Sequence, residues 1–148
     1  MTLNGSWDQG ISSANPVTNP TVYSEELWFK TTTTNGGKIV GFEMPQTNVA
    51  MPGSGGTYDR HIYMDGAGKV WFGVYNGGYF TVSSPAALNN GAWHMAAATM
   101  GAGGMALWID GVKVGTSANT AGETTVSATE EISPRKPPIT APRVVQSF

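Results

Sequence analysis

The chain has 148 residues, which suits one domain with a single core, because single cores become inefficient above roughly 250 residues. Charged residues make up only 12% of it, glycine reaches 20 residues and cysteine is absent, a composition typical of an extracellular β-protein that excludes disulfides and Cys-based zinc sites. Residues 1–132 hold ten acidic and five basic side chains, and no segment approaches the ~20 apolar residues of a membrane span, which argues against nucleic-acid partners and a transmembrane segment.

Short apolar segments with a two-residue period follow one another along the chain, bounded by glycine, asparagine, aspartate and proline. We expect eight strands and no helix. The strands cover residues 21–30, 38–43, 59–64, 69–75, 79–83, 93–99, 105–109 and 112–116. Asp110-Gly111 joins the last two, and a type I′ turn needs positive φ at both positions, so this hairpin has the clearest local signal. The regular spacing predicts an antiparallel sandwich or barrel.

The composition changes near the C-terminus. Residues 133–148 contain four prolines and three basic residues but no acid. Because proline cannot donate to a β-ladder, we expect this tail to be extended or disordered, or to dock along a sheet edge. We interpret its Pro-rich run, 135–143, as an irregular terminus in preference to a polyproline II docking segment.

Four segments resemble the laminin-G-like, concanavalin A-like jelly roll. They are YSEELWFKTTTTNGGKIVGF, DRHIYMDGAGKVWFGVY, NNGAWHMAAATM and MALWIDGVKVGT, in the order in which the family has them. The resemblance covers about residues 17–122 and implies an all-β antiparallel jelly-roll sandwich on a secreted or cell-surface protein. It also implies a glycan or another surface ligand. We therefore divide the chain into an N-terminal segment 1–16, a sandwich 17–122 and a tail 123–148.

The chain departs from the family after the last hairpin. Family members continue with a Trp-containing strand and a returning strand like FxGxIDEVxVY, and neither is recognisable after residue 122. The sequence therefore resembles a truncated or frame-disrupted copy, in which an edge beside the first strand would have unpaired backbone groups. The tail, the segment 3–11 or a second chain could cover that edge. The last possibility would make the protein a homo-oligomer.

Catalysis is not favoured by the acidic residues. Jelly-roll glycoside hydrolases need two carboxylates facing one sugar, which on a strand requires acids at i and i+2 or i+4. No pair within a predicted strand has this spacing, and Glu25 and Glu26 are adjacent and point to opposite faces. We interpret the two histidines, His61 and His94, as structural, because no GxSxG elbow accompanies them.

Candidate ligand-binding residues come from the aromatic side chains, because sugar faces stack on flat rings. Tyr58, Tyr75 and Tyr79 flank predicted loops, and Asn76 is a polar neighbour. The tryptophans are interpreted as packing residues, either between the sheets or on a concave face, and Trp93 as a loop anchor.

Calcium is the usual ion of this fold, and it requires several oxygen ligands at once. Asp59 and Asp65 are the candidate carboxylate ligands, although each also suits a turn. The sequence as a whole predicts a non-catalytic carbohydrate-binding or adhesion module. A structural spacer without binding activity is the alternative, and a degenerate jelly-roll glycoside hydrolase is a third.

Overall fold

The computed structural model describes residues 2–3, 11–13, 15, 17–44, 57–123, 127–132, 139–140 and 144–147. Throughout these residues the regular structure is β-strand, and none of them forms a helix long and apolar enough to cross a membrane. Side chains are described for residues 13, 15, 17–42 and 59–123.

All eight predicted strands are present, with ends that differ from the predicted ones by at most two residues. They are β4 (Tyr23–Lys30), β5 (Gly37–Met44), β6 (Thr57–Met64), β7 (Val70–Tyr75), β8 (Tyr79–Ser83), β9 (Trp93–Gly101), β10 (Gly104–Ile109) and β11 (Val112–Ser117). Short strands precede and follow them: β1 (Thr2–Leu3), β2 (Ile11–Ser12), β3 (Val17–Thr18), β12 (Ser127–Ile132), β13 (Ile139–Thr140) and β14 (Val144–Ser147).

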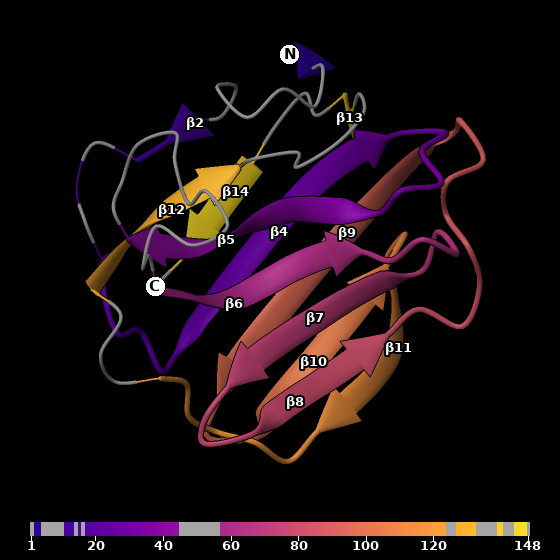
Figure 1. The fold of residues 1–148 in the computed structure, drawn as a ribbon. Coiled ribbons are helices and arrows are strands. Elements are labelled where there is room, and N and C mark those ends of the chain that lie inside the picture. The colour runs from indigo at the N-terminus through magenta and orange to yellow at the C-terminus, as the bar shows by residue number, and fades with distance from the viewer. Residues whose placement is uncertain are drawn as a thin grey trace.

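The strands form two antiparallel sheets that pack face to face (Figure 1). One sheet has the order β1-β13-β4-β9-β10-β11, with β14 also paired to β4. The other has the order β2-β12-β5-β6-β7-β8, with β3 also paired to β12. We call them the β4 sheet and the β6 sheet. The predicted all-β antiparallel sandwich is thereby confirmed.

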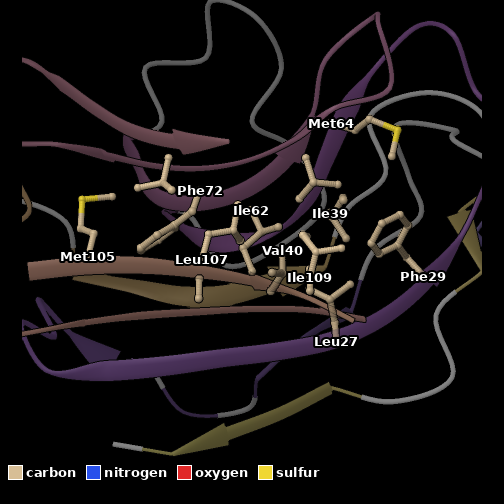
Figure 2. Close-up of a cluster of buried hydrophobic side chains, with 14 of the residues drawn as sticks. Leu27, Phe29, Ile39, Val40, Ile62, Met64, Phe72, Met105, Leu107 and Ile109 are labelled. Carbon is tan, nitrogen blue, oxygen red and sulfur yellow. The ribbon is translucent and has the colours of Figure 1, made fainter. Parts of the chain in front are cut away.

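The core lies between the two sheets, and the alternation of side chains along each strand creates it. In β4 the odd-numbered positions Tyr23 to Phe29 are buried, whereas Trp28 and Lys30 are exposed. Figure 2 shows Leu27 and Leu107 of the β4 sheet pointing toward apolar side chains of the β6 sheet, which include Ile62. The two inner faces therefore interlock as one hydrophobic layer.

The hairpin at Asp110-Gly111 has the predicted geometry. Both residues have positive φ, 50° and 81°, as a type I′ turn requires. Within β11, Gly115 lets the edge strands of the two sheets approach each other, because a Cβ there would lie 2.7 Å from Cγ1 of Val82 in β8.

Strands of the tail cover edges that the eight predicted strands leave. β14 pairs with β4, from Val144 opposite Leu27 to Ser147 opposite Ser24, and β12 pairs with β5. Of the three ways in which the edge beside the first strand could be covered, the structure shows the first: the tail docks along β4. β14 follows Pro142 and contains no proline, so each of its residues keeps a backbone N–H for the ladder.

Candidate functional site

A hollow of about 190 Å³ lies on the outward face of the β6 sheet, over β6, β7 and β8. Its lining residues are Asp59, Arg60, His61, Tyr63, Gly73, Val74, Tyr75, Tyr79 and Thr81. Figure 1 shows these three strands side by side in one layer of the sandwich. Every second residue of a strand points outward, and the register puts His61, Gly73 and Thr81 next to one another across the three strands.

Glycine forms the floor of this hollow. A Cβ at Gly73 would lie 3.2 Å from Cε1 of Tyr63 and 3.6 Å from Cγ2 of Thr81, so a side chain there would occupy the space between them. On β5, a Cβ at Gly41 would overlap the ring of His61, which shows that the imidazole lies across this second glycine. Gly73 thus leaves the hollow open at its base, and Gly41 leaves room for the imidazole ring of His61 at its margin.

Two aromatic pairs lie on this face of the sheet: both rings of one pair line the hollow, whereas Tyr63 of the other lines it and Trp71 lies beyond it. Tyr75 and Tyr79 pack edge to face with ring centroids 5.3 Å apart, and their exposed fractions are 38% and 86%. Tyr63 and Trp71 stack with centroids 6.2 Å apart and an interplanar angle of 11°. Because Trp71 and Tyr75 are four residues apart on β7, their Cα atoms are separated by roughly 13 Å at the rise of about 3.3 Å per residue. The Tyr63 ring lies between them, beside Gly73.

The turn at Asp65 holds the Tyr63–Trp71 pair in place. Trp71 donates a hydrogen bond from Nε1 to Oδ2 of Asp65 at 2.8 Å, and Oδ1 of Asp65 accepts from the backbone N–H groups of Ala67 and Lys69. Burial, followed by the charge of Asp65, raises the pKa of Tyr63, so its phenol stays a neutral hydrogen-bond donor and acceptor. This end offers both flat rings and a hydroxyl.

A buried ion pair lies under the Tyr75 end. Nη1 of Arg60 contacts Oδ2 of Asp59 at 2.8 Å, and the two side chains are each 1% exposed. Oδ1 of Asp59 accepts from the backbone N–H of Tyr75 at 2.6 Å and from that of Arg60 at 2.7 Å, while Oδ2 accepts from that of Glu123 at 2.8 Å. Arg60 donates to the carbonyl groups of Pro20 and Glu123. The pair therefore fixes the backbone that carries the Tyr75 ring.

The chain accommodates this pair by backbone strain and by close approach. Arg60 has φ 54°, which is unusual for a residue other than glycine. After β11 the chain passes over the pair at Gly122, where a Cβ would lie 2.6 Å from Cζ of Arg60. Such local strain is found where the surroundings hold a residue firmly in place.

The structure brings together only part of the predicted site. Tyr75 and Tyr79 form one end of the hollow. Asn76 is exposed in the turn between them and donates from Nδ2 to Oδ1 of Asn119 at 3.4 Å, so it lies outside the lining. Tyr58 is in β6 opposite Glu43, but its side chain lies outside the described residues.

Asp59 and Asp65 do not converge. They lie at opposite ends of β6, roughly 20 Å apart at the strand rise of about 3.3 Å per residue, and the carboxylate of each accepts hydrogen bonds from the protein. Among the described residues no group of three or more acidic or histidine side chains could hold a metal ion. The two aspartates therefore cannot share one calcium ion, and calcium binding stays a prediction.

Several residues of the hollow were not predicted from the sequence. His61 was interpreted as purely structural, and Tyr63, Gly73, Thr81 and Arg60 were not singled out. Except for Arg60, these residues occupy outward-facing strand positions, as Tyr75 does. The registers of the β6–β7 and β7–β8 hairpins would therefore have indicated them. Nothing in the sequence indicates that Arg60 adopts positive φ.

The expected separation of Glu25 and Glu26 is confirmed. Glu25 faces the core and is 0% exposed, and Glu26 is on the outward face of β4. Trp28 is 41% exposed, so the first of its two predicted placements, between the sheets, is wrong. Trp93, the predicted loop anchor, is 42% exposed. Within the described lining Asp59 is the one carboxylate, and its partner is Arg60.

His94 stabilises the last hairpin and lies away from the hollow. Its Nδ1 is 2.8 Å from Oδ2 of Asp110, and its Nε2 is 3.1 Å from Oδ1 of Asn90. Oδ1 of Asp110 accepts from the backbone N–H of Met95 at 2.8 Å. Partial burial acts to raise the pKa of Asp110, but hydrogen bonds from His94 and Met95 and the charge of His94 outweigh it, and the pKa is lowered.

This lowered pKa predicts an acid-sensitive contribution to stability. A carboxyl whose pKa is lower in the folded state stabilises the fold fully above its unfolded pKa of about 3.9, and the contribution disappears as pH falls through the folded pKa. The thermal midpoint is therefore expected to fall below about pH 4. Asp110→Asn, which suits the turn, should flatten part of this fall, and Glu26→Gln is the control. An unchanged acid limb in Asp110→Asn would contradict the assignment.

Comparison with known proteins agrees with this architecture. Residues 4–135 match a laminin-G-type family model described as the concanavalin A-like lectin/glucanases superfamily. The match extends beyond both ends of the predicted sandwich 17–122, whose limits stay a prediction. No curated protein matches the sequence.

Solved structures with the same fold include binding modules and an enzyme. Endo-β-1,4-glucuronan lyase from Trichoderma reesei has a TM-score of 0.62 at 13% identity, over 99% of this chain and 79% of the other. Domain 4 of the extracellular arabinanase AbnA from Geobacillus stearothermophilus, solved with arabinotriose, has a TM-score of 0.60 at 20% identity, over 98% of this chain and 68% of the other. The CBM40 module of Ruminococcus gnavus IT-sialidase, bound to α2,3-sialyllactose, has a TM-score of 0.57 at 13% identity, over 95% of this chain and 90% of the other. At these identities the similarity to solved structures shows the shared fold alone. The family model, which matches most of the chain, shows that this protein belongs to the concanavalin A-like lectin/glucanase superfamily.

Proposed function

We propose that this protein is a non-catalytic carbohydrate-binding module that holds a sugar chain in the hollow on β6, β7 and β8. The observation that carries the proposal is the arrangement of two aromatic pairs around a glycine floor. The apolar faces of sugars pack on aromatic rings, and their hydroxyl groups need nearby polar partners. Tyr63, Thr81 and His61 supply polar groups beside the rings.

The chemistry of the lining supports a role other than glycoside hydrolysis. Glycoside hydrolysis needs two carboxyl groups across the scissile bond, one to protonate the leaving oxygen and one to act as base or nucleophile. The carboxylate of Asp59 accepts four hydrogen bonds and is 1% exposed, which removes it from contact with a bound sugar. Glu25 is enclosed between the sheets. Family membership supports secretion or display at the cell surface, where such a module would meet glycans.

The proposal predicts that Tyr79→Ala weakens sugar binding without weakening the fold. The Tyr79 ring is 86% exposed, so its loss should change the free energy of unfolding by less than about 0.5 kcal/mol. Losing one stacking face should lower the affinity about tenfold, which corresponds to about 1.4 kcal/mol. A glycan array identifies a ligand, and calorimetric titration of both proteins measures the change.

The matched control is Trp28→Ala, which removes another exposed ring from the β4 sheet and should leave the affinity unchanged. A parallel titration in EDTA tests calcium, and we expect the affinity to be the same, because both candidate aspartates are engaged by the protein. If no glycan binds, the spacer interpretation is favoured. Equal affinities for Tyr79→Ala and the unchanged protein would place binding elsewhere.

A further inference from the structure

We infer that the hollow selects uncharged oligosaccharides over sugars that carry a carboxylate, and that it contacts more than one sugar ring. This inference rests on the proposed function and specifies its ligand class. The first part of it comes from the charges around the hollow, and the second comes from the distance between the aromatic pairs.

Among the side chains that the structure describes, the one cation in the lining is already used by the protein. Arg60 lines the hollow and would be the natural partner of an acidic sugar, but its side chain is 1% exposed. Each of its three nitrogens donates a hydrogen bond within the protein: Nη1 to Asp59, Nε to the carbonyl of Pro20 and Nη2 to that of Glu123. These bonds use three of the five guanidinium N–H donors. The other two are enclosed with the side chain, and the chain at Gly122 lies over Cζ, so an acidic ligand could reach them only by displacing that segment.

Other charges near the hollow do not favour an anion either. Lys38 is opposite Tyr63 in the ladder, but it is only 6% exposed and does not line the hollow. At the Trp71 end, the carboxylate of Asp65 accepts from the indole, with Lys69 close enough to lower the pKa of Asp65. An anionic sugar that reached this end would face the carboxylate of Asp65 as well as the ammonium group of Lys69, so it would gain little electrostatic binding energy.

The row of aromatic side chains along β7 argues for a chain of sugars. The Cα atoms of Trp71 and Tyr75 are separated by roughly 13 Å, which is longer than one sugar ring, and Tyr63 lies between them beside Gly73. A monosaccharide can therefore stack on one pair only. An oligosaccharide that lies along β7 over Gly73 can contact both pairs, so the affinity should rise from the monosaccharide to the trisaccharide.

The experiment is calorimetric titration of all probes in one buffer. The probes are arabinotriose, xylotriose and cellotriose with their monosaccharides, compared with trigalacturonic acid and α2,3-sialyllactose. We expect a neutral trisaccharide to bind at least about tenfold tighter than both acidic probes and its own monosaccharide. Acidic probes that bind equally well or better would overturn the selectivity while leaving sugar binding intact. If no probe binds, the proposed function fails together with this inference.

A charge-introducing variant tests the selectivity from the opposite direction. Thr81 is exposed beside Gly73, so Thr81→Lys adds a free cation to the floor without disturbing the core. Because Thr81 also contacts the sugar in our proposal, the quantity compared is a ratio. We expect this change to raise the ratio of the trigalacturonic acid affinity to the neutral-trisaccharide affinity at least about fivefold, as expected for an added exposed ion pair. Thr116→Lys adds the same charge at an exposed position of the β4 sheet and is the control. If Thr81→Lys did not raise the relative affinity for trigalacturonic acid, the result would count against the inference.

Discussion

Replacing Asp59 with alanine is expected to lower the free energy of unfolding by about 3–5 kcal/mol, because it leaves the guanidinium of Arg60 buried without its counter-charge. The carboxylate also accepts hydrogen bonds from the backbone N–H groups of Tyr75 and Glu123, and both donors would lose their acceptor. The residue thus connects the start of β6 to the end of β7 and to the chain after β11. Urea unfolding followed by tryptophan fluorescence measures the change.

Two further variants make this prediction sharper. Asp59→Asn keeps an acceptor oxygen and loses the charge, so we expect a smaller loss that still permits measurement if the alanine variant does not fold. Asp65→Ala removes a more exposed aspartate after the other end of β6. It loses three hydrogen bonds whose donors water can reach, so it should cost about 1–2 kcal/mol. If Asp59→Ala cost no more than Asp65→Ala, the ion pair would not be the structural support that we describe.

Filling the floor at Gly73 should abolish sugar binding while the protein stays folded. In Gly73→Val the new side chain enters the space between Tyr63 and Thr81, where a sugar would lie. Valine suits a strand, and its Cβ meets Tyr63 at 3.2 Å, a contact that a half-buried ring relieves by a small shift. We expect an affinity loss of about a hundredfold, or about 2.7 kcal/mol, measured by calorimetric titration of the best glycan.

The control for this prediction lies outside the hollow. Gly77→Ala is in the turn after β7, where a Cβ meets nothing within 4 Å but where φ is 68°. We expect it to lower stability slightly, because a residue with a Cβ is strained there, and to leave the affinity nearly unchanged. Binding by Gly73→Val at full affinity would show that the ligand does not cross the glycine floor.

The fold was predictable from the sequence because its signals are local. Turn residues separate the eight strands, and Asp110-Gly111 has the positive φ values that its composition requires. The pairing of Tyr75 with Tyr79 was within reach for the same reason, since one short turn brings both to the same face of a hairpin. In each case a few adjacent residues determine the geometry.

The rest depends on residues far apart in the chain. The ion pair at the base of the hollow needs Pro20 and Glu123 to reach β6, and no local pattern places either of them there. The tail covers the edge of β4 through Val144–Ser147, although nearby prolines favoured an irregular segment. The exposure of Trp28 depends on which side of β4 meets the other sheet, and a hydrophobic side chain alone does not specify that side.

The central claim is that sugar binds over Gly73 on the outward face of β6, β7 and β8. Backbone amide chemical shifts of the isotopically labelled protein, recorded during titration with the best glycan, test it most directly. We predict that the largest changes fall on Gly73, Tyr75, Tyr79 and Thr81 and are absent from Gly73→Val. Changes centred instead on Trp28 and Trp93 would place the ligand on the β4 sheet and contradict the account.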